Sequence, residues 1–207
     1  MVKSGQPHNT YAKKIIRIAV GTGLLLLIPL GLTLLGDGVD GQGWNWTLGD
    51  FIFAFVLLFA AGLTYEIVAR RSDNSTYRIA VGIAVMSALL LVWVNGAVGI
   101  IGEPGGPNLM YVGVLAVGFI GALLARFRPH GMARALFTMA IAQMLVPVIA
   151  LVTAKPQMTM EPPGVVGVFG LNAFFAMLFV GSALLFRRAS ATNSRSDRRL
   201  SEMGTGV

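Results

Sequence analysis

Three carboxamide side chains, Asn95, Gln143 and Asn172, interrupt stretches that are otherwise apolar. A primary amide both donates and accepts hydrogen bonds, and burying one without partners costs several kcal/mol. Such side chains therefore either bond to one another across helices, which holds a bundle together, or line a small polar binding site. Trp93 stands two residues before Asn95 and is a further candidate for that lining.

Glu66 is the acidic residue that is predicted to lie inside the hydrocarbon, whereas Asp50 stands at the outer limit of the same span. An intramembrane carboxylate is a default candidate for a proton or cation site. Arg70 follows four residues later, a spacing that lets a carboxylate and a guanidinium pair on one helix face. We expect a structural ion pair with Arg70 in preference to a proton or cation site.

Other chemistry finds little support in these residues. The chain has no cysteine, and its two histidines, His8 and His130, fall outside the apolar stretches. Neither has a second ligand at metal spacing, and Ser87 and Ser182 have no histidine or lysine in their spans to act as a base. We therefore predict no metal, no cofactor and no enzymatic activity.

Composition and run length indicate how these side chains are held. The 207 residues are 55% hydrophobic and 12% charged, against roughly 25% charged in soluble domains. A helix needs about 20 apolar residues to cross a bilayer. Six stretches qualify, at about 15–35, 50–69, 79–101, 109–125, 133–153 and 165–186. The sequence thus predicts an all-α, polytopic membrane bundle of six transmembrane helices with short loops.

The positive charges predict the orientation of that bundle. Of the 16 lysines and arginines, all except Lys155 lie at or before the start of the first span, after the end of the last span, or in the connections near 70–78 and 126–134. Because basic residues gather on the cytoplasmic side, both termini are predicted to be cytoplasmic. The net charge of +7 then reflects topology and not nucleic-acid binding. Residues 1–188 form the predicted transmembrane domain, and 189–207, rich in Ser and Arg, a disordered basic tail.

Span limits place Gln143 near mid-membrane, and Asn95 and Asn172 somewhat outward of it. The three amides are therefore expected to meet in the outer half of the bundle. Three functional classes stay open: a small carrier or channel with a polar site at these amides, a non-catalytic accessory or structural protein, and, ranked last, a membrane enzyme acting on lipid or quinone through Glu66 and the nearby arginines. The first predicts a cavity that holds water, and the second predicts a dry bundle that binds a second copy or a larger membrane partner.

Five phrases carry a resemblance: WNWT at 44–47, LTYE at 63–66, LVWVNGAVGIIG at 91–102, NLMY at 108–111 and GLNAFF at 170–175. On these the chain resembles a family of small, uncharacterised bacterial inner-membrane proteins with six spans, over nearly its whole length except the two tails. The resemblance implies a location in the bacterial cytoplasmic (inner) membrane and assigns no activity. Asn95 and Asn172 fall inside these phrases.

Overall fold

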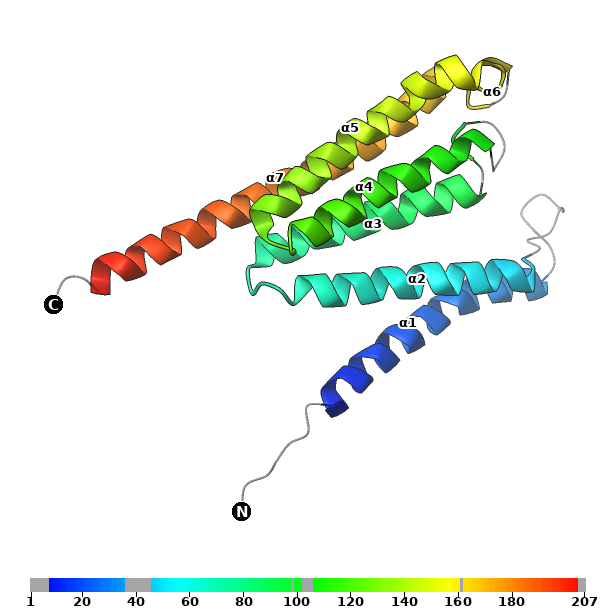
Figure 1. The fold of residues 1–207 in the computed structure, drawn as a ribbon. Helices are drawn as coiled ribbons and strands as arrows, with labels where there is room; N and C mark the ends of the chain where they lie inside the picture. The colour runs from blue at the N-terminus through cyan, green and yellow to red at the C-terminus, as the bar shows by residue number, and fades with distance from the viewer. Residues whose placement is uncertain (1–7, 36–45, 98, 102–105, 161, 205–207) are drawn as a thin grey trace. The chain divides into compact units, whose positions relative to one another are not determined.

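The computed structural model describes residues 8–35, 46–97, 99–101, 106–160 and 162–204. Its helices are α1 (His8–Leu35), α2 (Leu48–Ala69), α3 (Ser75–Ala97), the 3₁₀ helix η1 (Gly106–Leu109), α4 (Met110–Leu124), α5 (Pro129–Thr153), α6 (Lys155–Met160) and α7 (Gly164–Gly204) (Figure 1).

Six of these helical segments are long and apolar enough to cross a membrane, and the described ranges contain no strand. They are the segments within α1, α2, α3, η1–α4, α5 and α7. The prediction of an all-α, polytopic membrane protein with six membrane-spanning helices is confirmed for the described residues. Helices satisfy every backbone hydrogen bond within one segment, which is what a hydrocarbon environment demands.

The chain divides into two compact units, Met1–Glu66 and Ile67–Val207. In the first unit, α1 and the larger part of α2 approach closely at Gly62, where an added Cβ would lie 2.8 Å from Cγ2 of Ile18. At the start of α2, Thr47 donates from its backbone N–H and its hydroxyl to the Asp50 carboxylate, at 2.8 and 2.7 Å. This reciprocal contact fixes the first turn of the helix.

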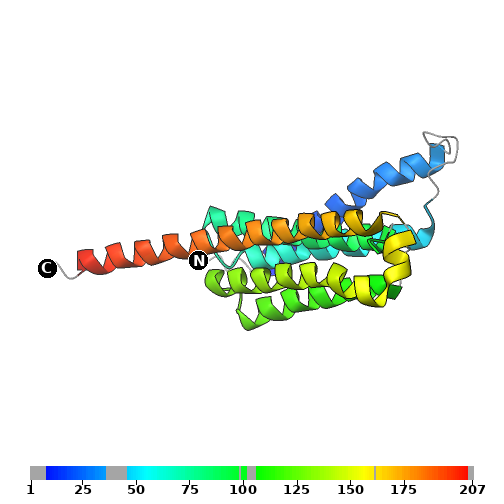
Figure 2. The same ribbon diagram turned by 90° about the horizontal axis from the view of Figure 1, so that it is seen from above.

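The second unit is built on four long helices, α3, α4, α5 and α7, which run side by side (Figure 2). The most extensive packing joins α5 to α7, while α7 also packs on α3 and α4 packs on α5. Across the α3–α7 contact, the buried Ser182 hydroxyl donates to the carbonyl of Ala80 at 2.7 Å. α5 therefore lies between α4 and α7, and its side chains form much of the core.

Small residues let α4 and α5 approach each other. A Cβ on Gly121 would lie 2.7 Å from Cβ and 3.3 Å from Cα of Ala135. The turn between these helices carries left-handed backbone at Arg126 and Phe127, with φ of 49° and 59°. Tyr77 on α3 donates its hydroxyl to the Phe127 carbonyl at 2.8 Å and so holds the turn against α3.

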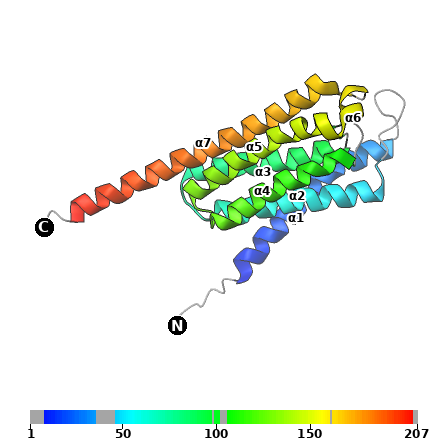
Figure 3. The same ribbon diagram turned by 45° about the horizontal axis from the view of Figure 1, so that its top comes forward.

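Two helix ends differ from the sequence predictions. The third span is predicted to continue to residue 101, but α3 ends at Ala97, and Gly99 has a left-handed φ of 75°. α7 continues to Gly204 (Figure 3), across residues 189–204 that the sequence predicts to be disordered. No glycine or proline occurs from 189 to 203 to stop the helix, which explains the difference physically.

We predict that Gly121→Ala destabilises the protein by about 1–3 kcal/mol, because two helices must separate to admit one methyl group. Gly113→Ala is the matched control on the same helix, since its Cβ would meet nothing within 4 Å. It should be neutral or stabilising by up to about 1 kcal/mol. Unfolding of both variants in lipid–detergent micelles, followed by circular dichroism, measures the difference. Equal effects would contradict the close α4–α5 contact.

Candidate functional site

Gln143 and Asn172 meet in the core of the second unit. The Gln143 side chain on α5 donates from Nε2 to Oδ1 of Asn172 on α7 at 2.9 Å. Asn172 in turn donates from Nδ2 to the hydroxyl of Tyr111 on α4 at 2.9 Å. Gln143 and Asn172 are 0% exposed and Tyr111 is 1% exposed. One chain of side-chain hydrogen bonds thus joins three helices.

The orientation of these amides follows from a backbone contact. Nδ2 of Asn172 also lies 2.8 Å from the carbonyl oxygen of Val168. Only a nitrogen can donate to that carbonyl, so Oδ1 of Asn172 must face Gln143, and Gln143 must present its own nitrogen. The remaining atom, Oε1 of Gln143, is buried without a hydrogen-bond partner.

Asn95 takes part in a second cluster, at the connection between α3 and α4. Its Nδ2 donates to the backbone carbonyl of Asn108 at 3.1 Å, which fixes the orientation of this amide as well. Its Oδ1 is buried without a hydrogen-bond partner. Asn95 therefore repeats the pattern of Gln143, with a paired nitrogen and an unpaired oxygen.

The Asn108 side chain organises the non-helical backbone that follows α3. Its Oδ1 accepts from the N–H groups of Ile100 and Ile101 at 2.9 and 3.0 Å, and its Nδ2 donates to the Ile101 carbonyl at 3.0 Å. Ile100 and Ile101 are 0% exposed. Within a membrane, non-helical backbone is tolerated only where the protein supplies hydrogen-bond partners for its polar groups. The Asn108 side chain supplies those partners for the backbone of Ile100 and Ile101.

The two clusters are neighbours along one helical segment. Asn108 and Tyr111 stand three residues apart across the junction of η1 and α4, and both are buried. Side chains at this spacing lie on one helix face about 5–6 Å apart at Cβ. We name the set Asn95, Asn108, Tyr111, Gln143 and Asn172 the polar band. Its five residues lie on α3, η1, α4, α5 and α7, one on each.

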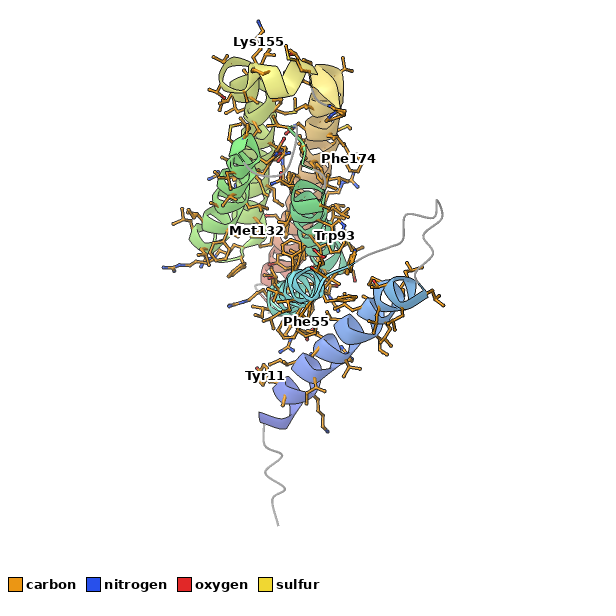
Figure 4. The ribbon with its side chains drawn as sticks, turned by 90° about the vertical axis from the view of Figure 1, so that its right-hand side faces the viewer. Tyr11, Phe55, Trp93, Met132, Lys155 and Phe174 are labelled. Atoms are coloured by element: carbon orange, nitrogen blue, oxygen red, sulfur yellow. The ribbon has the colours of Figure 1, made fainter. Side chains whose placement is uncertain are left out.

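The structure brings together Gln143 and Asn172, as expected from the sequence, but it pairs Asn95 with Asn108. Trp93 is half-buried on α3 (Figure 4). Residues two apart on a helix project from different sides, so Trp93 and Asn95 do not share a face.

Asn108 and Tyr111 were missed as site residues. The sequence signal for them was the NLMY phrase at 108–111, which places both where the fourth span begins.

Glu66 makes an ion pair in the first unit. Its Oε1 lies 2.8 Å from Nζ of Lys14 on α1. This contact joins α1 to α2 within the first unit. The pair with Arg70 that helical spacing predicts stays a prediction. The pair is partly exposed, with side chains 20% and 37% accessible, so its expected net contribution is about 0–1 kcal/mol.

The polar band is suited to hydrogen bonding and not to acid–base or metal chemistry. It contains amides and one phenol, with no carboxylate, amine or imidazole. Within the described part of the chain, no group of three or more His, Cys, Asp or Glu side chains could hold a metal ion. What the arrangement offers is two fixed acceptor atoms, Oδ1 of Asn95 and Oε1 of Gln143.

No known family model, curated protein or solved structure matches this chain.

We predict that Asn172→Leu lowers stability by about 1–3 kcal/mol, because it leaves Nε2 of Gln143 without an acceptor in a buried position. Gln143→Leu removes one bond and exchanges the unpaired oxygen of Gln143 for an unpaired Oδ1 on Asn172, so the number of unpaired oxygens is unchanged and its cost should stay below about 1 kcal/mol. Thr138→Val is a control on α5, where the exposed hydroxyl bonds only to its own helix at Arg134. Denaturant unfolding in bicelles measures the free energy of unfolding of the three variants and ranks their losses of stability. A larger loss for Gln143→Leu than for Asn172→Leu would contradict the network.

Proposed function

We propose that this chain is a small, non-catalytic membrane carrier or channel that binds a small polar solute at the polar band. The observation that carries the proposal is the pair of buried, unpaired amide oxygens on Gln143 and Asn95. In a bundle whose amides serve only packing, both ends of each amide are expected to find partners, because an unpaired group costs about 1–3 kcal/mol. A solute that pairs with these atoms recovers that cost.

The non-helical backbone beside the band supports the same proposal. Gly99, Ile100 and Ile101 are buried although they follow the end of α3. In transporters, solute sites are typically formed where membrane helices are interrupted, because freed backbone groups and polar side chains gather there. Here the freed backbone groups lie at the connection between two spans, α3 and α4, where Asn95 and Asn108 bind them, and Asn108 stands three residues from Tyr111.

The second candidate is an accessory or structural protein that binds a larger membrane partner or a second copy. It is favoured by the amide nitrogens, since those of Asn95, Asn108, Gln143 and Asn172 all donate to protein acceptors. Hydrogen bonds of this kind between membrane helices stabilise bundles by about 0.6 kcal/mol on average.

For Glu66, the ion pair with Lys14 favours a structural role in the first unit over a proton or cation site.

We further propose that the chain lies in the bacterial inner membrane with both termini in the cytoplasm. The support is the charge distribution, because Arg128 precedes α5 and Lys155 follows it. A helix of 25 residues at 1.5 Å per residue is about 37 Å long and separates these two positions across a bilayer. Arginines cluster with Arg128, while Lys155 is the single basic residue predicted on the outer side.

This orientation predicts a labelling pattern that is simple to read, since the chain contains no cysteine. Lys155→Cys should react with a membrane-impermeant maleimide applied to intact spheroplasts, and Arg128→Cys should react only after the membrane is opened. Both side chains are exposed, so access is limited by topology. The reverse pattern would place the termini outside.

The carrier or channel proposal predicts solute movement through purified protein in liposomes. Stopped-flow light scattering would follow swelling with glycerol, urea and formamide. At least one solute should equilibrate faster than in protein-free vesicles, and Gln143→Leu should return its rate to that background, while Thr138→Val should not. If no solute moves faster than the background in folded wild-type protein, the accessory role replaces this proposal.

A further inference from the structure

The polar band leaves two acceptor oxygens unpaired, whereas every amide nitrogen in it has at least one partner. Each of its four amide nitrogens donates to a protein oxygen: Asn95 to Asn108, Asn108 to Ile101, Gln143 to Asn172, and Asn172 to both Val168 and Tyr111. The amide oxygens of Asn108 and Asn172 accept bonds, whereas those of Asn95 and Gln143 do not. A group that completes the band must therefore bring N–H or O–H.

Exchanging the nitrogen and oxygen of these amides does not remove the imbalance. Turning Asn172 over would set its oxygen against the carbonyl of Val168, 2.8 Å away. Turning Asn95 over would do the same against the carbonyl of Asn108, 3.1 Å away. Two oxygens at these distances repel each other, so the unpaired atoms are oxygens in every acceptable assignment.

From this imbalance we infer that the polar band binds a small, uncharged solute with N–H donors, of the class of simple primary amides. This inference rests on the proposed function, because it names the ligand class of the same site. The amide class fits because a primary amide offers two N–H groups on one nitrogen. Its oxygen can also accept a hydrogen bond from the Tyr111 hydroxyl, because that hydroxyl accepts from Asn172 and can still donate its own proton.

Charge is the second constraint on the ligand. Among the described residues, the buried polar side chains are Thr22, Ser87, Asn108, Gln143, Asn172 and Ser182, all uncharged. An ion entering this core would lose its hydration without a counter-charge, which is expensive. An anion would also meet the two unpaired amide oxygens, which repel negative charge. Two amide oxygens are far fewer than the six to eight oxygens that typically surround a dehydrated cation such as Ca²⁺.

The test observes Gln143 directly in the full chain. Glutamine occurs at 6, 42, 143 and 157, so Gln6→Asn, Gln42→Asn and Gln157→Asn leave Gln143 as the single glutamine while the polar band stays intact. Selective ¹³C labelling of glutamine then gives one side-chain carbonyl signal by solid-state NMR in bilayers. Formamide and formate are the probes, because they match in size but only formamide is neutral and carries N–H donors.

Formamide should move the Gln143 carbonyl signal saturably, with a half-maximal concentration in the millimolar range or above, since three heavy atoms can contribute only limited affinity. Formate should leave the signal in place. The inference is overturned if neither probe moves the signal, or if formate moves it as much. It is also overturned if the carbonyl is already bonded to water, seen as a deuterium isotope shift, and formamide does not change it.

The same sample separates this inference from the proposed function. A formamide-dependent shift without formamide flux into liposomes supports the ligand class and contradicts transport. Flux of a solute without a shift at Gln143 supports transport and overturns the ligand class. Asn95→Leu provides a second test, because it removes the other unpaired oxygen while the Gln143 carbonyl signal can still be observed. We expect the half-maximal formamide concentration for the shift of that signal to rise several-fold.

Discussion

A polar group in hydrocarbon must be hydrogen-bonded within the protein, and the second unit is arranged around that requirement. Asn172 meets it with three bonds, to Gln143, to Tyr111 and to the Val168 carbonyl of its own helix. Because these partners come from different helices, the requirement of one side chain fixes how α4, α5 and α7 lie against one another. Apolar packing alone distinguishes poorly between rotations of a helix in lipid, whereas a directional bond selects one of them.

Close approach is what makes those bonds possible. Side-chain amides reach only a few ångströms, so the helices that carry them must pack tightly. Gly121 opposite Ala135 allows this for α4 and α5, and the bond from Ser182 to the Ala80 carbonyl shows the same proximity for α3 and α7. Gly121 therefore acts together with the amides, since a small residue brings the two backbones together and the polar side chains then fix the arrangement.

Sequence reasoning was sufficient where length and composition decide the outcome. Six apolar stretches of sufficient length predicted six membrane helices, and the helices are present. It also predicted that Gln143 and Asn172 meet, from their depth in the spans. It could not assign Asn95 to Asn108, because that contact depends on α3 ending at Ala97. An apolar run continues through Ile101, so hydrophobicity alone gives no sign of that end. The ion pair of Glu66 with Lys14 was not predicted for a related reason: helical spacing reveals partners on the same helix, and Lys14 lies on another helix.

A packing network and a binding site differ in whether every buried polar atom has a hydrogen-bond partner within the protein. Gln143 and Asn172 alone fit a packing network, since one such contact is common in membrane bundles. Packing, however, gives no reason to bury an amide oxygen without a donor, and the band does so at Gln143 and again at Asn95. Both amides are anchored through nitrogen, which directs both oxygens away from their protein partners. The same unpaired oxygen at two independent amides is therefore the observation on which the proposed binding site rests, and a ligand that fits it must supply hydrogen-bond donors.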